Sequence, residues 1–98
     1  MNKKTAMKWI KALRSGKYIQ GRWFLHTVDK DTKKGYYCCL GVAREIGLCV
    51  AQRGASQKLV ANNFLPNEVQ DKLVKFNDDR GWSFKQIANW IEENYEKF

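Results

Sequence analysis

The segment that most constrains the fold is residues 35–48, because the spacing of its hydrophobic residues changes partway. Its sequence is Gly-Tyr-Tyr-Cys-Cys-Leu-Gly-Val-Ala-Arg-Glu-Ile-Gly-Leu. The aromatic start of this segment is typical of the end of a buried strand. Leu40, Ala43 and Ile46 then recur every three residues, which predicts a short helix with one apolar face. Gly47 is placed to end that helix in a left-handed conformation. A strand that leads directly into a helix must be held from both sides, so we expect the rest of the chain to surround it.

Three further helices are predicted from apolar stripes and capping residues. The first follows Thr5, a suitable N-cap, and ends at Gly16. Pro66 fits the first turn of another helix. Ser83 and Gln86 form a capping box at the start of the last helix, which is predicted to bury Ile87, Ile91 and Tyr95. The stripes of the first two consist of Ala6, Trp9, Ile10 and Leu13, and of Val69, Leu73 and Phe76.

The remaining segments predict a small sheet. Residues 22–28 alternate well enough for a strand whose two faces are both apolar, and therefore both covered. Residues 29–35 are polar and end in Gly, which indicates a hairpin loop leading back to the central segment. Residues 49–50 predict a brief strand, residues 53–56 a loop, and residues 57–63 are ambiguous. The predicted fold is α+β, with about four helices packed around a small antiparallel hairpin or three-stranded sheet, in one domain spanning residues 1–98.

The positive charge of the chain is concentrated in its first third. Residues 1–34 carry ten Lys and Arg against two Asp, whereas residues 61–98 carry five basic and seven acidic groups, out of a net charge of +8. This asymmetry favours an anionic partner, although Lys-rich helices that keep a small protein dissolved would give the same pattern. The sequence has no apolar run of membrane-spanning length and no secretory signal, and its three cysteines do not suit a disulfide framework. We therefore expect a soluble, intracellular protein without membrane association.

The sequence gives little support for a metal site, a cysteine nucleophile or a phosphate-binding loop. Cys38 and Cys39 would point to opposite faces of a strand, which disfavours a shared metal site, and we expect neither a metal nor a cofactor. Cys39 near a helix N-terminus, with His26 on a neighbouring strand, could act as a nucleophile, but buried cysteines are common structural residues. Residues 15–17, Ser-Gly-Lys, follow a helix and lack the upstream glycine of a phosphate-binding loop.

A basic and aromatic cluster within residues 14–26 is the better candidate for a site. Arg and Lys side chains bind phosphates, and Tyr or Trp rings stack on bases. The same residues could instead be solvated cations beside core aromatics. A further cation on the short helix is expected nearby. The eight candidate ligand-binding residues are Arg14, Lys17, Tyr18, Gln20, Arg22, Trp23, His26 and Arg44.

Several blocks of the sequence resemble a family of small, mostly uncharacterised bacteriophage proteins. The most specific are Ala-Leu-Arg-Ser-Gly-Lys-Tyr at residues 12–18 and Cys-Cys-Leu-Gly-Val at residues 38–42. Further similarities occur at residues 20–21, 25, 76–78, 83–84 and 87–88, so the resemblance covers most of the chain. It implies a phage origin and a location in the host cytoplasm, but no activity that can be transferred residue by residue.

Three functional hypotheses follow. The first is a non-catalytic antagonist of host defence that binds and sequesters an anionic nucleotide signal. The second is a nucleic-acid-binding protein in which the same cations follow the backbone. The third is an inhibitor that docks on a host defence protein through exposed aromatic residues. Whether the chain forms a homo-oligomer is left open by the sequence.

Overall fold

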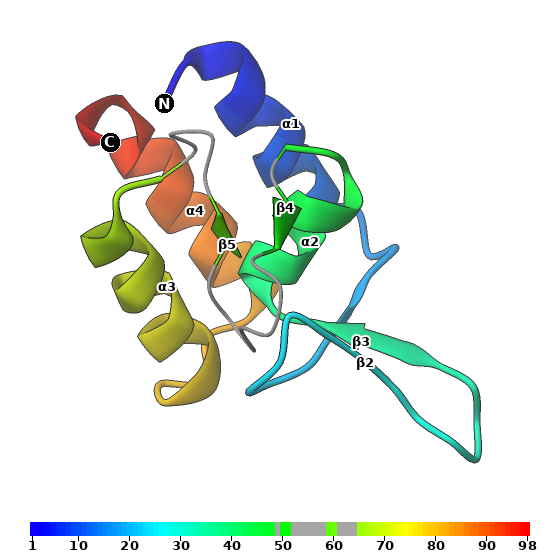
Figure 1. Cartoon of the computed structure of the whole chain (residues 1–98). Coiled ribbons are helices and arrows are strands. Elements are labelled where there is room, and N and C mark those ends of the chain that lie inside the picture. The colour runs from blue at the N-terminus through cyan, green and yellow to red at the C-terminus, as the bar shows by residue number, and fades with distance from the viewer. Residues whose placement is uncertain (49, 52–58, 61–64) are drawn as a thin grey trace.

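The computed structural model describes residues 1–48, 50–51, 59–60 and 65–98, and within them it shows an α+β fold (Figure 1). The helices are α1 (Lys3–Arg14), α2 (Cys39–Glu45), α3 (Asn67–Asp78) and α4 (Phe84–Asn94), followed by a 3-10 turn (Tyr95–Lys97). The strands are β1 (Ile19–Gln20), β2 (His26–Val28), β3 (Gly35–Tyr37), β4 (Val50–Ala51) and β5 (Leu59–Val60). Four helices with a small three-stranded sheet confirm the predicted fold class.

The helices enclose the core, and the hairpin of β2 and β3 projects away from them (Figure 1). Helices α1 and α4 lie side by side, while α2 packs against both α1 and α3. The N-terminal ammonium group donates a hydrogen bond of 3.2 Å to the carbonyl oxygen of Tyr95, so the two ends of the described chain are close together. The largest side chains that are fully buried come from all four helices and include Trp9, Leu40, Leu73 and Ile91. No helix in the described ranges combines the length and apolarity needed to cross a bilayer.

Helix α1 begins three residues earlier than predicted. Its N-cap is Asn2, whose Oδ1 accepts a 2.8 Å hydrogen bond from the backbone N–H of Thr5. Thr5 is therefore inside the helix, and the prediction that it caps α1 was wrong. Asn is at least as good an N-cap as Thr, and starting at Asn2 adds nearly a turn of helix. The predicted apolar stripe is buried, and Gly16 has a φ of +75°, which confirms where the helix ends.

The last helix agrees closely with its sequence prediction. The Ser83 hydroxyl accepts from the N–H of Gln86, and the Gln86 side chain accepts from the N–H of Ser83. Ile87 and Ile91 are fully buried, as predicted. Tyr95 is only partly buried and begins the 3-10 turn that follows the helix.

The sheet is mixed, with strand order β1-β3-β2. Strands β2 and β3 form the predicted antiparallel hairpin, in which Val28 pairs with Gly35. Strand β1 pairs with β3 in parallel, with Ile19 opposite Tyr36. Beyond β3, the chain enters α2 after a single residue, and Gly47 follows with a φ of +83°. The central segment thus has the predicted strand and helix.

The strand predicted over residues 22–28 is wrong in its first half. Only His26–Val28 is a strand, and residues 22–25 form an irregular loop. Its faces are not covered either, because the side chains of Trp23 and Phe24 are 58% and 52% exposed. The backbone leaves the sheet after Gly21, and the carboxylate of Asp78 accepts a 3.1 Å hydrogen bond from the N–H of Trp23. This long-range contact holds the loop in a shape that local alternation does not predict.

The segment after α2 is described only in part. Val50 and Ala51 of β4 pair antiparallel with Val60 and Leu59 of β5. The brief strand predicted at residues 49–50 therefore includes Val50, while residue 49 lies outside the described residues. The loop predicted at residues 53–56 also lies outside them.

Candidate ligand-binding site

The two cysteines at the start of α2 have structural contacts. Cys38 is the N-cap, and its Sγ accepts a 3.3 Å hydrogen bond from the N–H of Gly41. The Cys39 thiol is fully buried and donates to the carbonyl oxygen of Leu73 at 3.8 Å. Burial raises the pKa of Cys38 to about 11 and also raises the pKa of Cys39. A nucleophilic cysteine needs a lowered pKa and access to substrate, so this arrangement disfavours the thiol chemistry considered for Cys39.

The raised pKa of Cys38 predicts that stability falls at alkaline pH. An unfolded thiol loses its proton near pH 9, whereas the folded thiol keeps it until about pH 11. The protonated Cys38 thiol therefore makes its full contribution to the free energy of unfolding below pH 9. That contribution, roughly 2–3 kcal/mol, is lost between about pH 9 and 11. We expect Cys38→Ser, which keeps an acceptor for the Gly41 N–H but does not titrate, to lose less stability over this interval. Urea unfolding of both proteins at about pH 8 and about pH 10.5 measures the difference, and equal losses would contradict it.

Two of the predicted ligand-binding residues connect elements of the fold. Arg14 donates to Oδ1 of Asn89 at 2.7 Å and forms an ion pair with Glu92 at 3.3 Å, which joins α1 to α4. Gln20 donates from Nε2 to Oδ1 of Asn77 at 2.8 Å and to the carbonyl oxygen of Trp82 at 2.7 Å. The terminal nitrogens of Arg14 and the amide nitrogen of Gln20 are therefore already engaged within the chain.

Arg22 and Trp23 lie at the C-terminal end of α3. A Cβ atom added to Gly81 would be 3.0 Å from Nη2 of Arg22, so the guanidinium group lies against the turn between α3 and α4. Trp23 lines a shallow recess of about 350 Å³ whose other walls come from α3 and the residue after it. That recess contains three carboxylates and one ammonium group, a balance that disfavours an anion. Its charged lining residues are Asp71, Lys75, Asp78 and Asp79.

The other four predicted residues lie in or beside one groove. We call it the tyrosine groove; it has a volume of about 380 Å³ and is lined by Lys17, Tyr18, Ile19, Lys34, Gly35, Tyr37 and Glu45. The rings of Tyr18 and Tyr37 meet edge to face, with centroids 5.3 Å apart. The ammonium group of Lys17 is 5.6 Å from the centre of the Tyr18 ring. His26 is stacked on Tyr37 with centroids 4.4 Å apart.

The groove has a net positive lining and a neutral phenol. Lys17 and Lys34 contribute two ammonium groups against the single carboxylate of Glu45. Burial is the main cause that raises the pKa of Tyr37, followed by the charge of Glu45, while Arg44 acts in the opposite direction. At neutral pH the hydroxyl of Tyr37 is therefore protonated and can donate a hydrogen bond. The chemistry available is that of an anion site with aromatic walls.

Five of the seven residues that line this groove are absent from the set predicted from the sequence, which includes only Lys17 and Tyr18. Lys34, Gly35 and Tyr37 come from the hairpin and β3, and Glu45 comes from α2. They reach Tyr18 because β1 pairs in parallel with β3, which no local pattern indicates. The sequence predicts the hairpin loop, and the cations in that loop, Lys34 among them, are the signal that extends the site.

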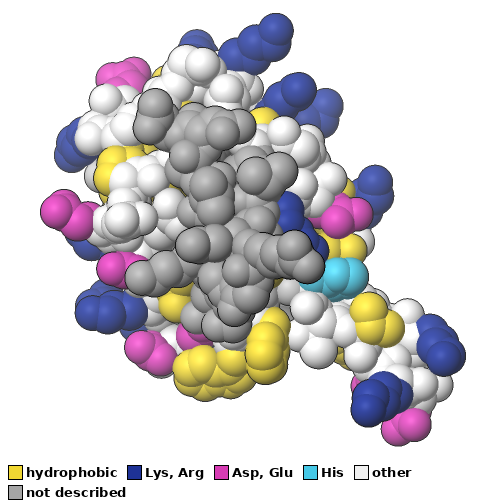
Figure 2. All heavy atoms as spheres, in the orientation of Figure 1, with side chains coloured by type: hydrophobic (Ala, Val, Ile, Leu, Met, Phe, Trp, Pro, Cys, Tyr) yellow, Lys and Arg dark blue, Asp and Glu magenta, His cyan; other side chains and the backbone are white. Residues whose placement is uncertain are grey.

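Charge that is concentrated along the sequence is spread out in space. On the face shown in Figure 2, Lys and Arg side chains lie at separate points around the rim, with acidic side chains between them. Hydrophobic side chains gather at the lower edge of the same view, beside the base of the projecting hairpin. The described residues on this face therefore form no continuous basic track of the kind that follows a nucleic-acid backbone.

Comparison with known proteins gives one match. A search of curated proteins finds no relative, and no solved structure is similar. A family model matches residues 1–62, a region that contains every residue lining the tyrosine groove. The chain therefore belongs to the family described as a domain of unknown function, DUF8296.

Proposed function

We propose that this protein is a phage-encoded, non-catalytic antagonist of host defence that binds an anionic nucleotide in the tyrosine groove and sequesters it in the host cytoplasm. The observation that carries the proposal is the groove itself, which combines two ammonium groups with two tyrosine rings. The resemblance to small phage proteins supports the biological setting. The buried thiols with raised pKa values support binding without covalent catalysis.

Each part of a nucleotide has a suitable partner in this groove. Lys17 and Lys34 are both exposed and can bind phosphate oxygens through charge-assisted hydrogen bonds. The ring of Tyr18 offers a surface for base stacking, and the Tyr37 hydroxyl can donate to a ribose or base acceptor.

The test is calorimetric titration with cyclic dinucleotides, ADP-ribose and a mixed-sequence oligonucleotide, each at two salt concentrations. We expect a small nucleotide to bind with a shallow salt dependence because few phosphates are involved. Lys17→Gln and Lys34→Gln should each weaken binding by about 1.5–3 kcal/mol, the cost of losing a hydrogen bond to a charged group. Lys8→Gln is the matched control, since Lys8 is an exposed cation on α1 outside the groove.

Two outcomes would contradict the nucleotide proposal. Tight binding to the oligonucleotide alone, with a log–log salt slope near −0.7 per phosphate, would identify a single-strand nucleic-acid-binding protein. Equal effects of Lys8→Gln and the two groove variants would show that only general positive charge matters.

Docking on a host protein is a second candidate because of Trp23 and Phe24. Their side chains are exposed, and Trp23 has a φ of +76°, a strained conformation for a bulky residue. Strain of this kind is common where a side chain must be presented to a ligand or partner. Trp23→Gly would relieve the strain and remove the ring, so it should retain the fold while abolishing partner capture from host cells. Met7→Ala, at a less exposed apolar residue on α1, should leave capture unchanged.

A further inference from the structure

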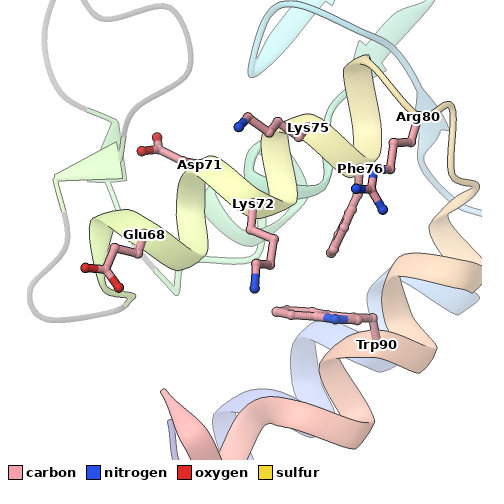
Figure 3. A pocket seen from close by; sticks show the side chains of 7 residues that line it. All are labelled: Glu68, Asp71, Lys72, Lys75, Phe76, Arg80 and Trp90. Atoms are coloured by element: carbon pink, nitrogen blue, oxygen red, sulfur yellow. The ribbon is translucent and has the colours of Figure 1, made fainter.

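A second groove lies between α3 and α4 (Figure 3), and it shares no lining residue with the tyrosine groove. Its volume is about 560 Å³, and its aromatic walls are Phe76 and Trp90. None of its lining residues belongs to the basic cluster predicted from the sequence. Its charged lining residues are Glu68, Asp71, Lys72, Lys75 and Arg80.

The aromatic walls are rigidly supported from behind. Phe76 and Trp90 meet edge to face with centroids 5.2 Å apart. Trp82 stacks on Phe76 at 4.0 Å, and Phe98 stacks on Trp90 at 5.6 Å. Ring contacts on several sides restrict both side chains, which provides a preformed surface for a planar ligand.

The cations nearest these rings have no carboxylate partner within the described residues. The ammonium group of Lys72 lies 5.9 Å from the centre of the Trp90 ring, and the guanidinium carbon of Arg80 lies 5.5 Å from that of Phe76. Among the described residues, the one ion pair with a nitrogen–oxygen distance within 4.0 Å joins Arg14 to Glu92. Lys72 and Arg80 therefore form no ion pair with a described carboxylate.

The charges separate along the groove. Figure 3 shows Lys72 and Arg80 reaching toward the side where Trp90 lies, while Glu68 and Asp71 extend away from that ring. The aromatic end is therefore the positive end. Exposed Lys and Arg side chains can leave the ring faces at little cost, because cation–π contacts at exposed sites contribute only about 0.5–1 kcal/mol.

We propose that the groove between α3 and α4 is a second binding site, for a planar aromatic ring that carries a phosphate or carboxylate group. The ring stacks on Trp90 in the place that Lys72 covers, and the anionic group is bound by Lys72 and Arg80. This site shares no lining residue with the tyrosine groove, so it stands whether or not the proposed nucleotide site is correct.

Indole N–H signals in a ¹⁵N-correlated NMR spectrum test this proposal directly. The tyrosine groove contains no Trp, so the signal of Trp90 reports on the second groove alone. Trp9 is the internal control because it is fully buried and its Nε1 donates to the carbonyl oxygen of Cys39 at 3.0 Å. Assignment follows from Trp90→Phe, which removes one signal.

The probes are AMP and benzoate. Adenosine is the control that lacks the anionic group, and ribose 5-phosphate is the control that lacks the aromatic ring. We expect AMP, benzoate or both to shift the Trp90 signal saturably, and the signal of Trp9 to stay in place. Response to only one of them identifies the ligand as a nucleotide or an aromatic carboxylate. Lys72→Gln and Arg80→Gln should each reduce affinity roughly 10-fold, as expected for losing one hydrogen bond to a charged group. Lys85→Gln, at an exposed cation on α4 outside the groove, should not.

The proposal is overturned by any of three results. The first is no saturable shift of Trp90 with either AMP or benzoate at about 10 mM, where even a millimolar complex would be largely formed. The second is binding of adenosine or ribose 5-phosphate as tight as that of AMP. The third is an equal loss of affinity in the Lys85→Gln control. Calorimetric binding of a nucleotide without a Trp90 shift would retain the tyrosine groove and reject this second site.

Discussion

Gly41→Ala should destabilise the protein by more than about 4 kcal/mol, a size of effect that single substitutions rarely reach. A Cβ atom at this position would collide with the backbone carbonyl of Leu25, and it would be 2.7 Å from the carbonyl carbon and 3.2 Å from Cα. Both partners are backbone in a buried region, so no side chain can rotate to make room. Relief requires α2 to move away from the chain segment that leads into β2. Urea unfolding of the purified variant, or its failure to accumulate as folded protein, measures the effect.

Gly47→Ala is the matched control for this substitution. Gly47 has a φ of +83°, but a Cβ atom there would meet nothing within 4 Å. The cost should therefore be about 1–2 kcal/mol, the penalty for placing a side chain in the left-handed region. If Gly41→Ala is no worse than Gly47→Ala, the close contact between α2 and Leu25 is wrong.

Asn77→Ala should cost about 3–5 kcal/mol because the side chain is fully buried and connects α3 to the end of β1 and the residue after it. Its Nδ2 donates to the carbonyl oxygen of Gly21 and to Oδ1 of Asp78, both at 2.8 Å, and its Oδ1 accepts from Gln20. Removing the amide takes a donor from the partly buried carbonyl oxygen of Gly21 and from the buried Oδ1 of Asp78, and each such loss costs about 1–3 kcal/mol. Equilibrium unfolding measures the loss of stability.

Asn89→Ala provides the comparison for Asn77→Ala. Asn89 is exposed, and its Oδ1 accepts from Nη2 of Arg14 at 2.7 Å. Exposed contacts of this kind contribute little, so we expect a change within about 0.5 kcal/mol. Similar losses for the two variants would mean that Asn77 does not anchor the loop between β1 and β2 to α3.

The helices could be predicted because their signals are local. The Ser83 and Gln86 capping box, the left-handed Gly16 and Gly47, and the buried stripe of α1 all depend on residues within a few positions of one another. Backbone hydrogen bonds within a helix join near neighbours, so the period of the apolar residues largely determines which face is buried. The hairpin followed for the same reason, since its two strands are joined by a short polar loop.

The site was only partly predictable from the sequence. The sequence identifies Lys17 and Tyr18 as site residues. It also predicts, from their closeness in the chain, that the other residues of the 14–26 cluster share the same site. Tertiary structure separates them, because Asp78 holds the backbone of Trp23 on the α3 side, while parallel pairing of β1 with β3 directs Tyr18 toward Tyr37. The groove between α3 and α4 depends on the packing of two helices and has no signal in either one alone.

By itself, the sequence determined the four helices, most of their ends and the class of fold, because these depend on hydrogen bonds and apolar contacts between near neighbours in the chain. Which cations and rings meet was decided only by tertiary structure. Contacts such as that of Gln20 with Asn77, or of Leu25 with Gly41, join residues far apart in sequence. Their formation depends on the packing of the whole chain, and local periodicity carries no information about it.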